Sequence, residues 1–411
     1  MVEIRSQPGG PSVLVSELLA LLPESYIADL AEKMVVDKWA KKLKASTLFQ
    51  LVLFSILNSE RLSLRVMQEN MKDPMFAILG QAVCADEVTW VSIRNRLMHI
   101  NSDFFRGLYE KVYQMAEKTY GEKALGSHHL KRFDSTMVHT FAHLLEGMKV
   151  GNSSKGKTQA KFTTELKDDF LIHMSFHKDQ AHLSEETALK EAVLARSNPE
   201  EQEISVFDKG MKSRKTFAQF DDEGTLFVAR VHETPRYELI STHSEEIKST
   251  QLPQEDLEFI QDSVVNLYES SHKVNPVKLR LIQFRVTKDG KTLSFVTNVW
   301  DIEPQAIAQI YKMRWDIEVL FRFMKQEMNL SHFVSNDQNA IEAMLYCTMI
   351  ASMLVLIYKK KNNIASYKLA KIQFFNELIN DILLEYLESP ESSQHLKQLL
   401  LNVKEKRKGV T

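Results

Sequence analysis

The order in which hydrophobic periodicities follow one another most constrains how this chain folds. Residues 13–120 show helical spacing. That spacing is set by Leu48, Leu51, Val52, Ser55 and Ile56. From about Gly126 onward, short apolar runs typical of strands take over, and one helical pattern lies among them. The predicted strands lie at 130–138, 170–177 and 204–208, and the helix at 187–197. Strands interleaved with a helix predict an α/β core.

A second β-rich region spans residues 217–298. Asp289-Gly290 there predicts a hairpin with a two-residue loop. An acidic stretch, 255–268, predicts a helix that interrupts these strands. The predicted strands are 226–231, 237–242, 278–287 and 291–298. The chain then returns to helical patterns and ends in a basic tail, with no internal repeat.

Composition limits the classes of protein that the chain can belong to. Its 411 residues suffice for two or three domains, and 44% hydrophobic with 26% charged residues is ordinary for a soluble globular protein. A net charge of −2 excludes a chain that is basic overall. An enzyme acting on DNA with this balance must therefore concentrate its cations locally.

Two cysteines, Cys84 and Cys347, are too few and too far apart for a zinc knuckle or a disulfide framework, which fits a reducing cytoplasm. The N-terminal residues lack the pattern of a signal peptide. The most apolar run, residues 343–358, predicts a helix buried in the protein rather than a membrane span. We expect a cytoplasmic protein with no membrane partner.

Polar side chains at fixed spacing mark residues 311–325. On one α-helix, Tyr311, Arg314, Glu318 and Lys325 fall at about 0°, −60°, −20° and −40°, and Arg322 at about 20°. Apolar residues on the opposite side can bury. They are Ile317, Leu320, Phe323 and Met324. An amphipathic surface helix with ordinary ion pairs explains the same pattern. A carboxylate flanked by cations also suits a metal ion beside a phosphodiester.

The spacing Tyr-x2-Arg-x3-Glu-x6-Lys resembles the signature of insertion-sequence transposases of the IS-four group, which are DDE-type enzymes. The resemblance implies an α/β fold: a ribonuclease-H-like mixed-sheet core with a β-rich insertion domain, plus helical N-terminal and C-terminal regions. The expected parts are a helical DNA-end-binding region at 1–125, core segments at 126–216 and 299–345, the insertion at 217–298 and a helical region at 346–411.

Such enzymes hold two divalent metal ions with three carboxylates, and oxygen ligands suit Mg²⁺ or Mn²⁺. The resemblance assigns these roles to Asp134, Asp208 and Glu318. Asp134 stands in Phe-Asp-Ser-Thr, at the predicted end of a strand, and Asp208 stands in Phe-Asp-Lys-Gly. Met211 replaces an aromatic residue of the family pattern. Taken alone, each aspartate is more often a turn residue. Asp179, which follows a predicted strand, is a rival for one place, whereas Asp168 and Asp169 suit a loop.

The resemblance also implies DNA contacts. Tyr311, Arg314 and Lys325 are expected to hold phosphates near the scissile bond. Further candidate DNA-binding residues are Arg322, Lys209, Lys212, Arg214 and Lys215. A loop with Lys149, Lys155, Lys157 and Lys161 is a second basic patch, although charge runs are more often solvated surface. Phe295 or Trp300 is a candidate for stacking a flipped base, with a core role favoured for both. The pairs His139/His143 and His173/His177 lack a zinc-site form and are interpreted as structural.

In the N-terminal region, Ser63 and Thr89 are candidate helix N-caps, and the helix after Thr89 carries Arg94 and Arg96. A plain helical bundle explains them, and the resemblance implies a module that grips the transposon end. The leading hypothesis is a DNA transposase acting as a homodimer on double-stranded DNA, namely terminal inverted repeats and target. A metal-dependent structure-specific nuclease and a DNA-binding protein with a decayed core are the alternatives.

Overall fold

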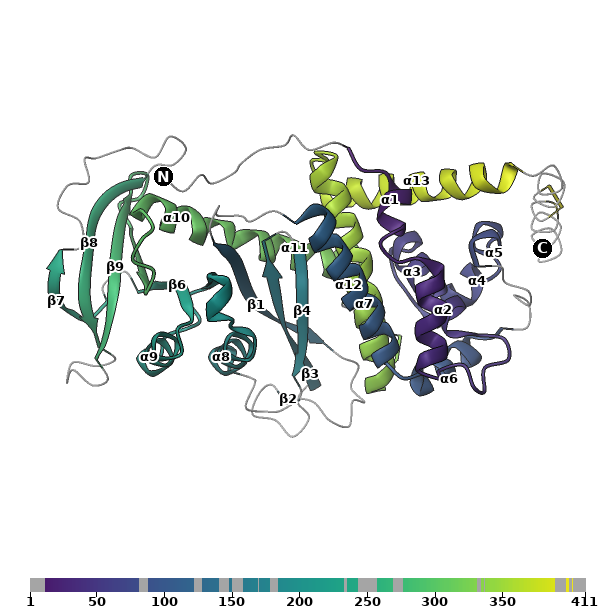
Figure 1. Cartoon of the computed structure of the whole chain (residues 1–411), viewed down its shortest axis with the longest axis horizontal. Helices are drawn as coiled ribbons and strands as arrows, with labels where there is room; N and C mark the ends of the chain where they lie inside the picture. Colours follow the sequence, from purple (N-terminus) through teal and green to yellow (C-terminus); the bar gives the residue numbers. More distant parts are fainter. Residues whose placement is uncertain are drawn as a thin grey trace. The chain divides into compact units, whose positions relative to one another are not determined.

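The computed structural model describes most of the chain and divides it into two compact units (Figure 1). The first consists of Met1–Ser6, Gly121–His139 and Leu145–Phe321, and the second of Gln7–Tyr120, Thr140–Leu144 and Arg322–Thr411. The residues that the structure describes are 12–80, 88–121, 128–139, 148–149, 158–168, 170–177, 184–232, 235–242, 257–268, 276–330, 334–335, 337–388, 397–398 and 401.

A ten-stranded mixed sheet forms the first unit. Its strand order is β2-β3-β1-β5-β6-β10-β9-β8-β7, with β4 paired to β3. The strands are β1 His129–His139, β2 Met148–Lys149, β3 Thr158–Lys167, β4 Phe170–His177, β5 Glu203–Phe207, β6 Leu226–Val231, β7 Tyr237–Thr242, β8 Leu257–Leu267, β9 Val277–Val286 and β10 Thr292–Thr297. The helices are α8 Glu185–Arg196, α9 Arg214–Asp222, α10 Pro304–Met313 and α11 Trp315–Gln326, and α11 ends in the second unit.

The strand directions fit the ribonuclease-H-like core that the sequence predicts. Strands β4, β3 and β1 pair antiparallel, whereas β5 is parallel to β1 and β6 is parallel to β5. Parallel neighbours need a crossover, and helix α8 stands between β4 and β5 while α9 stands between β5 and β6. The predicted α/β fold is therefore confirmed.

Helices cover both faces of the sheet (Figure 1). On one face Phe133 of β1 packs with Val193 of α8 and Phe217 of α9. On the other, Leu130 of β1 packs with Ile307 of α10. Because side chains alternate along a strand, odd-numbered residues of β1 lie toward α8 and α9, and even-numbered residues toward α10.

Strand β8 corrects the prediction of a helix at 255–268. Val265 and Leu267 of this strand are buried, and the strand pairs with both β7 and β9. The acidic composition is misleading here, because Asp262 is buried and forms an ion pair with Arg280 of β9, with 2.7 Å between Oδ2 and Nη2. Cross-strand pairing has outweighed local propensity.

Strand β3 was not predicted, because its buried positions are polar. Glu165 is 2% exposed and lies 3.2 Å from the ammonium of Lys131 on β1. The same ammonium lies 2.6 Å from Glu203 of β5, and Lys167 lies 3.0 Å from Glu203. These buried charges join three neighbouring strands. Lys149 and Lys161 were predicted in a loop but lie on strands β2 and β3. Lys155 and Lys157 lie outside the described residues.

Helix α9 was likewise missed, within a region predicted as strand from residue 217. The Ser213 hydroxyl caps it by accepting the N–H of Thr216, and Phe217 and Phe220 bury on one side. The predicted hairpin between β9 and β10 is confirmed, but its loop is longer than two residues. It spans 287–291, and Gly290 takes the left-handed conformation with φ 71°.

The second unit is helical, as predicted for both ends of the chain. The helices are α1 Val15–Leu19, α2 Glu24–Lys33, α3 Ala45–Asn58, α4 Leu64–Asn70, α5 Pro74–Gly80, α6 Trp90–His99, α7 Asp103–Tyr120, α12 Gln338–Lys361 and α13 Tyr367–Leu387. The hydroxyls of Ser63 and Thr89 cap α4 and α6, accepting the N–H groups of Val66 and Ser92. Both N-cap predictions are confirmed.

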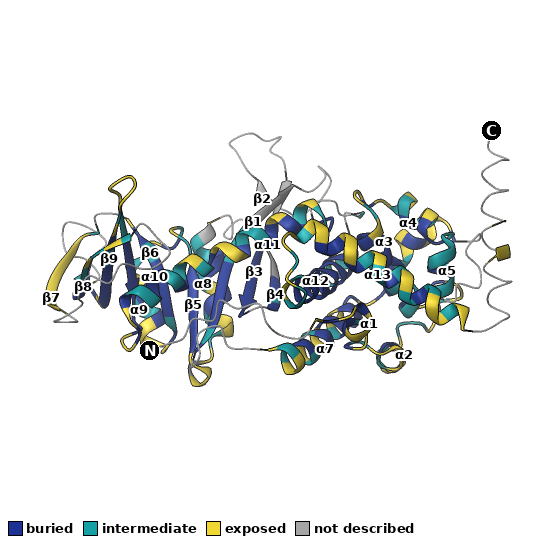
Figure 2. Ribbon diagram, turned by 90° about the horizontal axis from the view of Figure 1, so that it is seen from above, coloured by how far each residue is buried: buried dark blue, intermediate teal, exposed yellow. Residues whose placement is uncertain are grey.

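Helix α12 is the centre of this unit (Figure 2). It packs against α3, α6, α7 and α13, and every residue described from Ala343 to Tyr358 is buried apart from Tyr346. Helix α12 is long and apolar enough to cross a membrane, but 89% of its most apolar 18-residue stretch is buried inside the protein. That burial is typical of the core helix of a folded domain and confirms the prediction of a buried helix.

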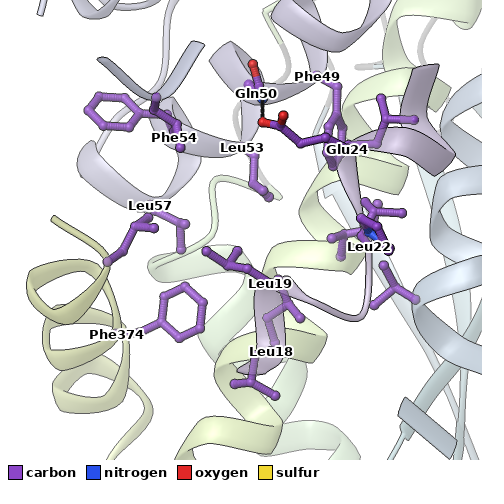
Figure 3. A pocket seen from close by; sticks show the side chains of 17 residues that line it. Leu18, Leu19, Leu22, Glu24, Phe49, Gln50, Leu53, Phe54, Leu57 and Phe374 are labelled. Atoms are coloured by element: carbon purple, nitrogen blue, oxygen red, sulfur yellow. Dashed lines mark hydrogen bonds between the residues drawn. The ribbon is translucent and has the colours of Figure 1, made fainter. Parts of the chain in front are cut away.

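The helical unit also contains an apolar hollow of about 210 Å³ (Figure 3). Leucine and phenylalanine side chains from α1, α3 and α13 line it, including Leu18, Leu53 and Phe374. At its edge the Gln50 amide donates to the Glu24 carboxylate at 3.5 Å. A hollow of this kind leaves its lining with fewer dispersion contacts than a filled core provides.

Candidate functional site

The register of β1 with its parallel neighbour β5 brings Asp134 opposite Asp208, the residue that directly follows β5. The β1–β5 ladder pairs His129 with Glu203 and ends with Arg132 opposite Val206. Two further residues in this register bring Asp134 opposite Asp208, and adjacent strands lie about 4.8 Å apart. Both aspartates occupy even-numbered positions, so both lie on the face that α10 covers. Backbone pairing alone thus brings together two carboxylates 74 residues apart in sequence.

The predicted position of Asp134 at the end of a strand is wrong. Strand β1 continues to His139, paired with β3 along that length. What ends near Asp134 is the ladder with β5, because β5 stops at Phe207. The carboxylate therefore lies at the end of a parallel ladder but within a strand, where backbone pairing to β3 still fixes its position.

The Asp134 carboxyl is desolvated and close to like charges. Its Oδ1 accepts the N–H of Ser135 at 2.9 Å. Burial is the largest of the effects that together raise its pKa from 3.8 to about 7; the Ser135 N–H and the Arg314 guanidinium oppose the rise, and the carboxylates of Asp208 and Glu318 contribute to it. The structure thus brings the three predicted carboxylates within electrostatic reach of one another.

Asp208 closes a tight turn directly after β5. Its Oδ1 accepts the N–H of Gly210 at 2.7 Å, which fixes the carboxylate at the sheet edge. Met211, which replaces the aromatic residue of the family pattern, is 1% exposed and belongs to the core cluster under α8 and α9. An apolar side chain of another shape thus anchors the same turn.

The Tyr311–Lys325 motif lies on two helices, not one as predicted. Helix α10 ends at Met313, α11 begins at Trp315, and Arg314 joins them. The N–H of Arg314 donates to Tyr311 O at 3.1 Å and that of Ile317 to Arg314 O at 3.2 Å. These i→i+3 bonds tighten the turn and separate the two helices.

Arg314 connects the two parts of this motif. Its Nη2 lies 2.6 Å from Oε1 of Glu318, and its guanidinium lies 5.5 Å from the Tyr311 ring centroid. Burial raises the pKa of the Tyr311 hydroxyl, while Arg314 opposes the rise. The other side of the Tyr311 ring packs against Phe295, with 5.1 Å between ring centroids. Phe295 is 1% exposed, which supports the core role favoured for it, whereas Trp300 is 40% exposed and the core role favoured for it is wrong.

Arg132 is a residue of this region that the sequence argument missed. It is fully buried on the same face of β1 as Asp134. Its Nη1 donates to Met313 O at 3.2 Å and to Asp316 Oδ2 at 2.8 Å. Among the described residues, its Nε and Nη2 have no hydrogen-bond partner. The available signal was its place two residues before Asp134, since alternation puts 132 and 134 on one face.

Comparison with known proteins identifies the family. A model described as a Transposase DDE domain matches residues 133–354, more than half of the chain. The chain belongs to the transposase DDE-domain family. Its match begins beside Asp134 and includes Asp208 and Glu318, so the three carboxylates lie within the domain.

Curated relatives of this DDE-domain protein are transposases. A putative transposase of Sinorhizobium fredii is 36% identical over 105 residues, covering 26% of this chain and 29% of the relative. The transposase for insertion sequence element IS231F of Bacillus thuringiensis subsp. israelensis is 21% identical over 94% of this chain and 89% of its own length. The chain spans less than a third of the first three relatives that it matches.

A solved structure of a piggyBac transposase synaptic complex with hairpin DNA is similar at a TM-score of 0.49 and 11% identity. The similarity covers 96% of this chain and 86% of that chain.

The predicted DNA-binding cations of the DDE domain lie at different places. Lys209, Lys212 and Lys215 are exposed after β5 and at the start of α9. Arg214 is half-buried, and its Nη1 donates to Lys212 O at 3.0 Å. Arg322 is exposed on α11, and Lys325 is half-buried one turn further along the helix. Their roles toward DNA stay predictions.

Metal binding is best judged from the donor set. Three carboxylates offer hard oxygen ligands of the kind that Mg²⁺ and Mn²⁺ prefer, so the residues fit such ions in kind. As they stand, no three acidic, histidine or cysteine side chains in the described part of the chain are arranged to hold a metal ion. One oxygen of Glu318 is instead engaged by Arg314.

One of the other aspartates considered, Asp168, and one histidine, His177, have partners of their own. Asp168 accepts the Leu130 N–H at 2.9 Å and lies 2.6 Å from His129 Nδ1, which suits the loop role predicted for it. His177 Nε2 lies 3.0 Å from the Thr163 hydroxyl on β3. Asp169, Asp179 and His143 lie outside the described residues, as do the side-chain surroundings of His139.

Proposed function

We propose that this chain is the transposase of an insertion sequence. It binds the terminal inverted repeats of the element and catalyses phosphodiester hydrolysis and strand transfer by a cut-and-paste pathway. The observation that carries the proposal is the register of β1 with β5, which brings Asp134 opposite Asp208. Glu318 lies close enough to contribute to the raised pKa of the Asp134 carboxyl. Membership of the transposase DDE-domain family supports it.

In this proposal Asp134, Asp208 and Glu318 hold two divalent ions, Mg²⁺ or Mn²⁺. Bound ions of this kind activate an attacking oxygen and stabilise the leaving one. The mutual repulsion of three carboxylates in a partly buried site supports the assignment, because cations are what would relieve it. Exchange of Glu318 from Arg314 to a cation would leave the guanidinium available to a DNA phosphate.

The remaining motif residues are proposed to position DNA. Arg314 offers a planar pair of donors for a phosphate, and its guanidinium lies over the ring of Tyr311. Lys325 and Arg322, further along α11, and the lysines after Asp208 would contact the backbone away from the scissile bond. The proposed assembly is a homodimer that holds two transposon ends and then target DNA in the bacterial cytoplasm.

The test is cleavage of a labelled duplex that carries the element's own terminal repeat, with Mg²⁺ or Mn²⁺. Glu318→Gln removes the charge but keeps the shape, so we expect cleavage to be lost and repeat binding to persist. Lys312→Gln, an exposed change in the last turn of α10, is the control and should cleave normally. Undiminished cleavage by Glu318→Gln would contradict the proposed catalytic role of Glu318.

Products joined to a second duplex distinguish a transposase from a nuclease with the same core. A nuclease would release cut ends without joining them. Specific repeat binding with no metal-dependent cleavage by the wild type would favour a DNA-binding protein whose core has decayed. Calorimetric titration of Mn²⁺ into wild type and Asp134→Asn measures metal binding independently of cleavage.

A further inference from the structure

The helical unit carries an open hollow of about 460 Å³ between the segment after α2 and helix α6. Cavities of several hundred cubic ångströms are typical of sites for small organic groups. The hollow lies within one unit and shares no residue with the carboxylate site. Its lining combines an indole, lysines and hydrogen-bonding side chains.

Trp39 is the most unusual lining residue. Its side chain is 85% exposed, and no large hydrophobic side chain among the described residues is more exposed. Lys38 Nζ lies 5.4 Å from the ring centroid, so a cation accompanies the indole. An indole in water forgoes the burial that most tryptophans obtain on folding, and its flat apolar face is available to stack on a planar group.

The segment that carries Trp39 is strongly basic in a chain of net charge −2. Lys38, Lys41, Lys42 and Lys44 lie within seven residues, and all four are exposed. The acidic residue of the segment, Asp37, is engaged by Arg96, with 2.6 Å between Oδ1 and Nη2. Four lysines against one aspartate give this segment a net positive charge, which complements a polyanion.

Arg96 makes the hollow a preformed site rather than a loose loop. From α6 its Nε donates to Leu43 O at 2.9 Å and its Nη2 to Val36 O at 3.0 Å. Asp37 in turn accepts the Ala45 N–H at 2.8 Å. These bonds fasten the basic segment to α6, so Arg96 holds the two sides of the hollow together.

Polar side chains of α6 complete the lining. Ser92, Asn95 and His99 lie one turn apart along the helix and offer a hydroxyl, an amide and an imidazole. His99 Nδ1 lies 2.7 Å from Asn95 O, which fixes the ring. Buried Leu43 and Val88 form an apolar floor. Amide and hydroxyl groups beside an aromatic ring suit the hydrogen-bonding edge of a nucleobase.

We propose that this hollow binds an unpaired nucleotide of a DNA strand. The base stacks on Trp39 with its edge toward Asn95 and Ser92, and Lys41 and Lys42 hold the flanking phosphates. The proposal rests on the proposed function, since it presumes that the chain acts on DNA. Contact with the backbone of an intact duplex needs neither a hollow nor an exposed indole, whereas stacking on aromatic side chains within a basic groove is how proteins hold single strands.

The test compares two labelled substrates by fluorescence anisotropy, with EDTA present to prevent cleavage. One is a blunt duplex of the terminal repeat, and the other is the same duplex with a short single-stranded extension. Trp39→Ala should weaken binding of the extended substrate about tenfold or more, since stacking of one base contributes about that factor, and change blunt-duplex binding little. Trp39→Phe, which keeps a ring, should restore most of the difference.

Lys41→Ala should weaken both substrates, more so at low salt, while Lys33→Ala, an exposed lysine of α2 outside the hollow, serves as the charge control. Because Trp39 is exposed, its replacement should leave the thermal unfolding midpoint unchanged. If Trp39→Ala weakens binding of both substrates equally, or of neither, the nucleotide site is overturned and the proposed transposase function stands. Failure of the wild type to bind either substrate overturns both.

Discussion

The guanidinium of Arg132 on β1 lies 2.8 Å from the carboxylate of Asp316 in the first turn of α11. Each partner is two residues from a carboxylate of the proposed site: Arg132 from Asp134, and Asp316 from Glu318. The same guanidinium also donates to Met313 O, at the end of α10. A buried arginine thus connects the strand that carries one carboxylate to the helix that carries another.

Arg132→Met is predicted to separate stability from activity. Two guanidinium nitrogens have no hydrogen-bond partner among the described residues, so an apolar side chain of similar length removes an incompletely compensated buried charge. We expect the free energy of unfolding to stay constant or to rise by about 1–4 kcal/mol. Cleavage should fall about 10- to 100-fold, as for supporting residues around a site.

Urea denaturation and cleavage rates measure the two effects of Arg132→Met. Arg285→Met is the matched control, since it changes an arginine of β9 whose side chain is 54% exposed and should alter both quantities less. A large loss of stability together with the loss of cleavage would mean that Arg132 acts through folding alone.

Lys131→Met is predicted to destabilise the sheet unit. Lys131 is 4% exposed, and its ammonium lies between Glu165 and Glu203, both of which are buried. Its removal leaves two buried carboxylates with less compensation, so the free energy of unfolding should fall by about 3–5 kcal/mol. Chemical denaturation measures the loss, and exposed Lys212→Met should change stability little. A loss as small as that of the control would show that Lys167 and Arg196 compensate both carboxylates.

Lys371 predicts a pH dependence of stability. It is 6% exposed on α13 and donates to the carbonyl oxygens of Ser59 and Glu327. Burial lowers its pKa from 10.5 to about 8, although Glu327 and Glu60 oppose the shift. Between these two pH values the unfolded chain binds more protons than the folded protein. The Lys371 contribution to the free energy of unfolding should therefore rise with pH across this window, by up to about 3 kcal/mol.

Denaturation of wild type and Lys371→Met between pH 7.5 and 10.5 checks this slope, and the difference between the two removes other titrating groups. Lys368→Met changes an exposed lysine of the same helix and should retain the slope. A wild-type slope equal to that of Lys371→Met would mean that the buried ammonium keeps its ordinary pKa.

The three carboxylates could be identified from the sequence because residues at fixed spacing and short strand patterns can be recognised along the chain without knowledge of the fold. Their convergence follows from the β1–β5 register, which no local pattern contains. The break at Arg314 was missed because a wheel drawn through Tyr311 and Glu318 assumes one continuous helix, whereas two i→i+3 bonds tighten the chain there. The roles of the carboxylates remain predictions.

Other elements were missed where burial is polar. Strand β3 buries Glu165 against Lys131, and β8 buries Asp262 against Arg280, so hydrophobic alternation is weak in both. Local propensity alone predicts a helix for an acidic segment. Only the partners on neighbouring strands show that the segment is a strand. The basic segment around Trp39 was overlooked because a charge run carries no sign of the concave surface that α6 forms beside it.

The pairing of β1 with β5 sets different limits on change in different parts of the chain. Residues may be inserted or deleted in the connections between these strands without altering how Asp134 and Asp208 face each other. A slip of one residue within either strand would turn its aspartate to the opposite face, among the phenylalanines under α8 and α9. Divergent members of the family are therefore expected to differ widely in the number of residues between the two aspartates, and hardly at all in the strand positions that precede each one.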